Sequence, residues 1–272
     1  MNSKHVSCVA ILCVRNEALQ IARALESYVR QGIEVVVIDH SSTDDTLNIC
    51  DHYFGQGLIR VQHLPWHGVY DQTAQLAAKE AIINSLSHDW VIHADADEWL
   101  QSPADAESLV DGISRVSAGG FNVINFEEFV FIPPVNADIP AVDSNFREEL
   151  LHYYFFSPAQ NRLMRAWRRA DGLSNRASGG HRLVGKDVRI APEPFILRHY
   201  IALSPQHALQ KYGDRKFSDA DMQKGWHSNR RNLCAHDLVF PRADTLKRLR
   251  VFNSKDFDRS EPKLTHFWNW GQ

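Results

Sequence analysis

The chain has 272 residues, of which 44% are hydrophobic and 23% charged, with 30 Lys and Arg against 33 Asp and Glu. This composition excludes a disordered chain, a collagen-like repeat and a small disulfide-stapled fold, and the length suffices for a sizeable core. No apolar run approaches the roughly 20 residues that span a bilayer, and residues 1–5 do not resemble a signal peptide, so we expect a cytoplasmic protein.

Charge is unevenly distributed along the chain. Residues 1–159 contain 8 basic and 22 acidic side chains, a net charge of −14, whereas residues 160–272 contain 22 and 11, a net charge of +11. Such a division arises when oppositely charged layers pack together, or when a cleft brings an anion to a metal held by carboxylates. Composition leaves both interpretations open.

The first half of the chain alternates between apolar runs and segments of helical periodicity. The apolar runs predict strands at 6–14, 34–39, 58–63 and 89–94. The periodic segments predict helices at 18–31, about 41–54 and 71–87. Because strand and helix alternate, parallel strands joined by right-handed crossovers are expected. The fold class is therefore α/β, with a Rossmann-like, mostly parallel sheet flanked by helices.

The order of the elements becomes less regular after this region. A helix is predicted at 104–116 and a long strand at 121–131, and three prolines predict a loop at 133–145. Two further strands are predicted, at 163–167 and 195–200. The tail after Pro205 is expected to be mostly helical.

Three polar clusters follow predicted parallel strands, namely Arg15-Asn16-Glu17, Asp39-His40-Ser41-Ser42 and Asp95-Ala96-Asp97. In an open parallel sheet, ligands bind beyond the carboxyl ends of the strands. If the extended conformation continues past Ala94, Asp95 and Asp97 point to the same side. Two carboxylates so close favour a divalent cation such as Mg²⁺ or Mn²⁺, which keeps positions open for substrate phosphates.

These segments resemble the three signature segments of family-2 glycosyltransferases with the GT-A fold, at residues 9–17, 37–46 and 90–100. The resemblance covers about residues 6–130. It is closest to the branch in which an Asn-Glu pair follows the first strand and an Asp-x-Asp-Glu-aromatic motif follows the fourth. It implies metal-dependent transfer of a sugar, with inversion at the anomeric carbon. The donor would be UDP- or GDP-linked, and the acceptor a hydroxyl group of a glycan or a lipid-linked molecule.

The resemblance also implies roles for individual residues. The Arg15, Asn16 and Glu17 turn would line the nucleotide site, and Asp39 would accept hydrogen bonds from the base. Asp95 would contact the ribose or the metal. Asp97 would bind the Mn²⁺ or Mg²⁺ that bridges the two phosphates and so take part in catalysis.

Outside the signature segments, Gln72 matches a polar position that faces the donor. Leu197-Arg198-His199-Tyr200, followed by Ser204 and Lys211, resembles a downstream pattern of the same branch. It implies that His199 completes the metal site. A basic side chain such as Lys211 or Arg215 is expected to assist the departing diphosphate. For the general base the candidates are Glu193, Asp219, Asp221 and His181, of which His181 is preferred.

We expect one continuous GT-A domain with two halves. Residues 1–130 would bind the nucleotide sugar, and residues 131–272 would form a less regular acceptor-binding half with a helical C-terminal tail. The basic surplus of the second half would face an anionic acceptor, a lipid-linked acceptor at a membrane surface, or only the donor diphosphate. Scattered basic residues argue against nucleic acid.

Two other function classes remain open. A nucleotidyltransferase on a related sheet also uses carboxylate-bound Mg²⁺, but it needs a glycine-rich basic loop after the first strand, and Arg15-Asn16-Glu17-Ala18 has no glycine. A non-enzymatic carbohydrate-binding protein would tolerate the loss of both Asp95 and Asp97.

Overall fold

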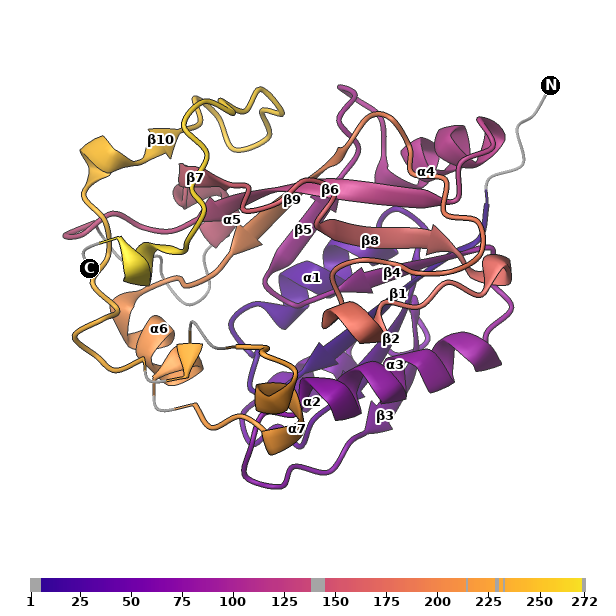
Figure 1. The fold of residues 1–272 in the computed structure, drawn as a ribbon, viewed down its shortest axis with the longest axis horizontal. Helices are drawn as coiled ribbons and strands as arrows, with labels where there is room; N and C mark the ends of the chain where they lie inside the picture. Colours follow the sequence, from indigo (N-terminus) through magenta and orange to yellow (C-terminus); the bar gives the residue numbers. More distant parts are fainter. Residues whose placement is uncertain (1–5, 138–144, 214, 228–229, 232, 271–272) are drawn as a thin grey trace.

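A single ten-stranded sheet runs through the molecule, with helices on both faces of its first part (Figure 1). The structure is a computed structural model that describes residues 6–137, 145–213, 215–227, 230–231 and 233–270. Along the sheet the strand order is β10-β7-β6-β8-β4-β1-β2-β3, and β9 pairs with β6 and β5.

The first half forms the predicted alternation of parallel strands and helices. Its strands are β1 (Cys8–Val14), β2 (Glu34–Asp39), β3 (Leu58–His63) and β4 (Trp90–Ala94), and all their mutual pairings are parallel. Its helices are α1 (Ile21–Val29), α2 (Thr46–Asp51) and α3 (Gln72–Ser85). The α/β prediction is confirmed, and each of these four strands lies within two residues of its predicted bounds.

Alternation along β1 explains why both faces of this sheet are covered. Ala10 and Leu12 belong to the apolar cluster that contains Leu25 of α1. Val9 and Ile11 belong to the cluster on the opposite face, which contains Ile82 of α3. Successive side chains of a strand point to opposite faces, so a continuous apolar run requires a helix on each side.

The part of the chain after β4 extends the same sheet mainly by antiparallel pairing. Its elements are β5 (Glu98–Gln101), α4 (Leu109–Ala118), β6 (Val123–Phe131), α5 (Phe146–Glu149), β7 (His152–Phe156), β8 (Leu163–Arg168), β9 (Phe195–Tyr200) and β10 (Lys247–Arg248). β8 lies antiparallel between β4 and β6 and so joins the two parts of the sheet. The proposed boundary after residue 130 falls inside β6, and the division into halves stays a prediction.

The tail differs from the helical segment that the sequence predicts. Helices α6 (Pro205–Tyr212) and α7 (Asp219–Gln223) form, but the described residues beyond Gln223 contain only turns, short 3-10 segments and β10. Phe267 and Trp268 pack instead into an apolar cluster with Val130 and Tyr154. The expectation of a mostly helical tail is therefore wrong, because its aromatic residues pack against distant strands rather than along one helix face.

Two further points concern segments singled out in the sequence. The predicted loop at 133–145 lies partly outside the described residues. The described residues of this segment, 133–137 and 145, belong to no helix or strand. No helix in the described part of the chain is long and apolar enough to cross a membrane.

Candidate active site

One cavity of about 1140 Å³ opens at the carboxyl ends of β1 and β4 and is lined by both halves of the chain. Nine of the ten predicted site residues line it: Arg15, Asn16, Glu17, Gln72, Asp95, Asp97, His181, His199 and Lys211. Asp39 is the exception.

The turn after β1 builds one wall of this cavity. Arg15 donates hydrogen bonds to the carbonyl oxygens of His40, at 2.8 Å, and Ser41, and its guanidinium lies 4.0 Å from the centroid of the Trp66 ring. Asn16 has a φ of 55°, a left-handed conformation that asparagine tolerates better than most residues. Its side-chain oxygen accepts a hydrogen bond from the Thr43 amide at 2.7 Å. The loops after β1 and β2 are thus tied together.

Asp39 lies behind this wall. Its side chain is 2% exposed, and its carboxylate oxygens accept hydrogen bonds from the Ser42 amide at 3.0 and 3.3 Å. This is the turn-forming bond that an Asp at a strand end commonly makes with the backbone that follows. Contact between Asp39 and a nucleobase stays a prediction.

The Asp95–Asp97 segment is a turn and not a continued strand. The Glu98 amide donates to the Asp95 carbonyl at 3.1 Å, and β5 then runs antiparallel to β9. Asp95, 44% exposed, has its carboxylate 3.3 Å from Arg165 Nη2 and 3.7 Å from Lys79 Nζ. The premise that the chain stays extended past Ala94 is therefore wrong. As a consequence of the turn, the two carboxylates of the motif have different partners.

Asp97 is buried and faces two cationic groups. Its Oδ2 lies 2.7 Å from Lys211 Nζ and 3.0 Å from His199 Nε2. Burial alone would raise the pKa of Asp97, but Lys211 and His199 outweigh burial and hold that pKa well below its usual range. Asp97 is therefore a carboxylate at neutral pH.

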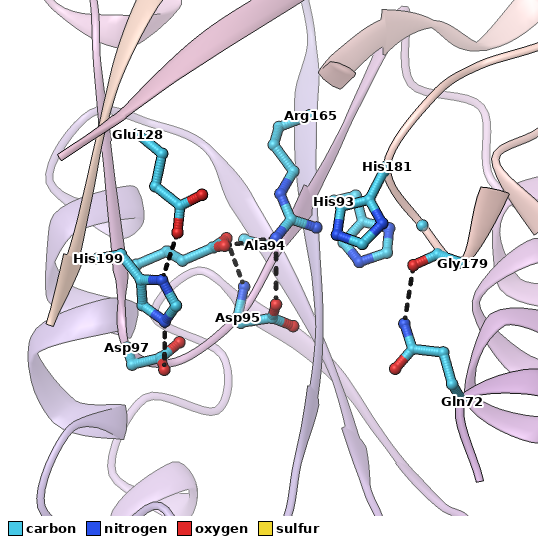
Figure 2. Close-up of polar contacts among 12 residues, drawn as sticks. Gln72, His93, Ala94, Asp95, Asp97, Glu128, Arg165, Gly179, His181 and His199 are labelled. Carbon is cyan, nitrogen blue, oxygen red and sulfur yellow. Dashed lines mark hydrogen bonds and ion pairs between the residues drawn. The ribbon is translucent and has the colours of Figure 1, made fainter. Parts of the chain in front are cut away.

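His199 lies between two carboxylates (Figure 2). Its Nδ1 is 2.6 Å from Glu128 Oε1 on β6, on the side opposite Asp97, and the other Glu128 oxygen pairs with Arg162. Burial would lower the pKa of His199, yet Asp97 and Glu128 raise it well above its ordinary value. The Glu128 contact orients the ring so that Nε2 is presented to the cavity side where Asp97 lies.

Lys211 also approaches Glu17, whose Oε1 lies 3.5 Å from the ammonium nitrogen. The other oxygen, Oε2, is buried and accepts no hydrogen bond within the described structure. Burial raises the pKa of Glu17 to about 7 although Lys211 opposes the rise. The Arg15–Glu17 turn and the Asp97 turn thus meet at Lys211, which comes from α6 in the second half.

The opposite side of the cavity carries His181 and Gln72. His181 Nδ1 is 3.1 Å from the Ser178 carbonyl oxygen, so Nδ1 carries the hydrogen and Nε2 can accept a proton. Burial lowers the pKa of His181 to about 4, so this imidazole is neutral at pH 7. Gln72 donates to the Gly179 carbonyl at 3.2 Å and accepts from the Tyr70 hydroxyl at 2.7 Å.

The other three candidates for the general base do not line the cavity. Glu193 lies 3.4 Å from Arg115, and Asp219 is exposed in the first turn of α7. Asp221 is fully buried, with its oxygens accepting from the Gln72 and Thr73 amides at 2.7 and 3.0 Å. It binds the first amides of α3 and does not line the cavity, so of these candidates only His181 lines it.

Sequence reasoning missed several charged residues of the cavity, notably Glu98, Glu128 and Arg165. Arg165 on β8 pairs with Glu98, and burial raises the pKa of Glu98 to about 7 despite this pairing. The signal was present in part, because Glu128 and Arg165 are ionisable residues inside predicted apolar strands. Such residues are rarely buried without a partner.

The carboxylate oxygens of Asp95 and Asp97 suit a hard divalent cation by donor type. His199, whose pKa is raised, offers a ligand nitrogen only after it loses a proton to make room for the ion. Only Asp97 and His199 are adjacent, because Asp95 is turned toward Arg165. Within the described residues, the one group of three His, Cys or acidic side chains with ligand atoms within 4.8 Å is Cys234, His236 and Asp237. It lies outside the cavity and is part of a turn in which Asp237 accepts from the Cys234 amide at 3.0 Å.

Comparison with known proteins identifies the family. Residues 9–163, more than half of the chain, match the sequence model of glycosyl transferase family 2. The chain belongs to glycosyl transferase family 2. The family-2 resemblance and the prediction of an enzyme of this class are thus confirmed, and the matched residues contain the whole Arg15–Glu17 and Asp95–Asp97 turns.

Curated relatives of this family-2 chain match over shorter segments. A stretch of 98 residues is 34% identical to an uncharacterized glycosyltransferase of Rickettsia felis, covering 36% of this chain and 31% of the relative. Another of 91 residues is 33% identical to the lipopolysaccharide core biosynthesis glycosyltransferase LpsC of Rhizobium meliloti, covering 33% and 31%. The match thus spans under a third of the length of these relatives.

A solved structure with a likeness to this chain is that of TarS from S. aureus in complex with UDP-GlcNAc. It has 14% sequence identity and a TM-score of 0.43, covering 80% of this chain and 69% of that chain.

Proposed function

We propose that this chain transfers a sugar from a nucleoside diphosphate donor, UDP- or GDP-linked, to a hydroxyl group of a glycan or lipid-linked acceptor, with inversion at the anomeric carbon. One observation carries the proposal. The turns after β1 and β4 meet Lys211 and His199 of the second half in one large cavity. Membership of family 2 supports the same reaction class.

The nucleotide would bind at the wall formed by the Arg15–Glu17 turn. Arg15 is held there by two carbonyl oxygens and by the Trp66 ring, so its guanidinium needs no reorganisation when a ligand arrives. Asp39 supports the neighbouring turn through its bonds to the Ser42 amide. Gln72, on the far side, would contact the sugar part of the donor.

A divalent cation, Mn²⁺ or Mg²⁺, would be held by Asp97 and His199, with Asp95 as a third ligand. The donor types fit, and the 44% exposed side chain of Asp95 has room to leave Arg165. When bound, the ion supplies positive charge that stabilises the departing diphosphate. Lys211, now paired with Asp97 and Glu17, adds positive charge at the same place.

Direct displacement also requires a group that takes the proton of the attacking hydroxyl. We assign this role to His181, because its Nε2 carries no hydrogen while Nδ1 donates to the Ser178 carbonyl. The ring lines the cavity away from Asp97, which leaves space for the donor between the base and the metal ligands. A lipid-linked acceptor would bring the chain to a membrane surface, and this contact stays a prediction.

Calorimetric titration with UDP and GDP, each with and without Mn²⁺, tests the proposal. One of the two nucleotides should bind at least tenfold more tightly with Mn²⁺, because the cation neutralises the charge that Asp97 and the diphosphate would otherwise bring together. UMP and GMP, which differ from UDP and GDP only in lacking the second phosphate, are the matched controls and should show no such dependence. Failure of both nucleotides to bind in either condition would contradict donor binding.

A further inference from the structure

The charged side chains that line the cavity differ in sign between the two halves of the chain. Residues before position 131 contribute six acids and one base, whereas all charged lining residues from the second half are basic: Arg162, Arg165, Lys211, Arg215, Lys216 and Arg230. Three of them pair with acids of the first half: Arg162 with Glu128, Arg165 with Glu98, and Lys211 with Asp97. The first-half acids that face these bases are thereby neutralised.

The remaining three, Arg215, Lys216 and Arg230, are named here the second-half cations. None of them has a carboxylate within ion-pairing distance among the residues that the structure describes. Cationic side chains gathered in a cavity repel one another unless an anion joins them. The cavity thus carries a positive surplus on this side before any ligand enters.

The second-half cations surround a pair of rings. Tyr70 and His227 lie with ring centroids 5.4 Å apart. The Arg215 guanidinium is 5.0 Å from the Tyr70 centroid, and Arg230 Nη2 is 2.9 Å from His227 Nδ1. The Lys216 carbonyl accepts from the Tyr70 amide at 2.8 Å, which brings Lys216 beside the same rings.

This cluster belongs to the His181 side of the cavity. The Tyr70 hydroxyl donates to Gln72, and Gln72 donates to the Gly179 carbonyl, two residues before His181. Figure 2 shows Gln72, Gly179 and His181 on one side of Arg165, and Asp97 and His199 on the other. Lys216 and Arg230 are therefore attached to the part of the site opposite the Asp97–His199 pair. Arg215 lies between the two sides, because its guanidinium is also 5.5 Å from the ring centroid of Tyr212, beside Lys211.

We propose that the acceptor carries an anionic group, a phosphate or a carboxylate, and that Arg215, Lys216 and Arg230 bind it. The inference rests on the proposed function and names the class of acceptor. A cavity of about 1140 Å³ exceeds the 300–1,000 Å³ typical of a site for one small ligand, so donor and acceptor fit together. The Tyr70 ring beside Arg215 provides an apolar face for a sugar ring that bears the charge.

The test compares three monosaccharides as probes of the acceptor side, namely glucose 6-phosphate, glucuronate and glucose. The protein is first saturated with Mn²⁺ and whichever of UDP and GDP binds, and each probe is then titrated by calorimetry. One of the two anionic probes should bind at least tenfold more tightly than glucose, and which one does so distinguishes phosphate from carboxylate. The preference should weaken as NaCl is raised, because the contact is between charges.

The double variant Arg215→Gln and Arg230→Gln should lose this preference while its affinity for the nucleotide changes less than twofold. Lys216→Gln, at an exposed position, should reduce the preference with the fold intact. Arg242→Gln is the matched control, since Arg242 is exposed, pairs with Asp244 and does not line the cavity. Thermal unfolding of each variant checks that the protein folds.

Two results would overturn the proposal. Equal affinity of the wild type for all three probes would contradict the proposal that the acceptor carries an anionic group. A loss of nucleotide affinity in the double variant, with the probe preference retained, would assign the second-half cations to the donor diphosphate. The same titrations without nucleotide separate this inference from the proposed function, because anion preference at Arg215 and Arg230 is measurable even where no nucleoside diphosphate binds.

Discussion

The two halves of the molecule bring their residues to the cavity in different ways. In the first half, Arg15–Glu17 and Asp95–Asp97 follow directly on the parallel strands β1 and β4. In the second half, His199 lies within β9, Lys211 comes from α6, and His181 comes from a long connection between β8 and β9. The first arrangement follows from the sheet topology alone, and the second needs contacts between segments far apart in the chain.

Those contacts are largely buried and polar. Asp221 joins α7 to the amino end of α3, and Arg198 is fully buried between Gln101 and the carbonyl oxygens of Phe252 and Ser254. The parallel strands, by contrast, are held by continuous apolar layers on both faces. The comparison teaches that apolar packing places the strands from which the first-half site residues follow, while the second-half site residues depend also on buried hydrogen bonds between distant segments.

The largest effect is expected where the two halves meet at Asp97. Asp97→Asn keeps the shape but removes the charge that faces Lys211 and His199, so turnover should fall on the order of 10³-fold. Release of nucleoside diphosphate with Mn²⁺ measures this. Asp105→Asn, an exposed acid outside the cavity, is the control. Turnover within tenfold of the wild type would show that the contact between the halves is not catalytic.

A second substitution tests how the second half is held. Arg198→Met should lower the free energy of unfolding by about 3 kcal/mol, because it leaves the carbonyls of Phe252 and Ser254 without their buried donor. Denaturant unfolding measures the change. Arg242→Met, at a 76% exposed ion pair, should cost under about 0.5 kcal/mol. Equal effects of the two substitutions would show that the buried hydrogen bonds of Arg198 do not stabilise the second half more than a surface ion pair does.

A third substitution tests the role of Glu128, which lies on β6 and orients the His199 ring. Glu128→Gln should weaken Mn²⁺ binding by about 10- to 100-fold, as is typical when the outer partner of a metal-binding histidine is altered. Electron paramagnetic resonance of free Mn²⁺ gives the affinity without any turnover. Glu127→Gln is the control from the same strand, because Glu127 pairs with Arg259 and does not line the cavity. Equal Mn²⁺ affinities in the two variants would leave Glu128 a purely structural residue.

The smallest effect concerns His207 of α6, one turn before Lys211. Burial first, and Lys211 second, lower the pKa of His207 to about 3, and its Nδ1 accepts the Leu203 amide at 3.1 Å. Between about pH 6.5 and 3 the unfolded chain binds a proton that the folded chain does not, so stability falls as pH falls. His207→Asn should reduce the loss between pH 7 and 5 by about 2 kcal/mol. An unchanged pH dependence of denaturant unfolding would contradict the assignment.

The comparison of the halves also explains what the sequence could predict. Apolar runs give β1 to β4 to within two residues, and their order places the polar clusters at one edge. β5 was missed because it has only four residues, and its partner β9 lies almost a hundred positions later, with Glu98 opposite His199. Asp39 accepts hydrogen bonds from the Ser42 amide in its own turn, and its contact with a nucleobase stays a prediction.

The sequence by itself determined the α/β fold class, the family and the carboxyl-end location of the Arg15–Glu17 and Asp95–Asp97 turns, because these depend on local periodicity and strand order. Only the tertiary structure decided which charges meet. It turns Asp95 toward Arg165 and Asp97 toward Lys211, and it places Glu128 behind His199. A buried charge takes its partner from whichever segment the fold brings within a few ångströms, and distance along the chain does not record that choice.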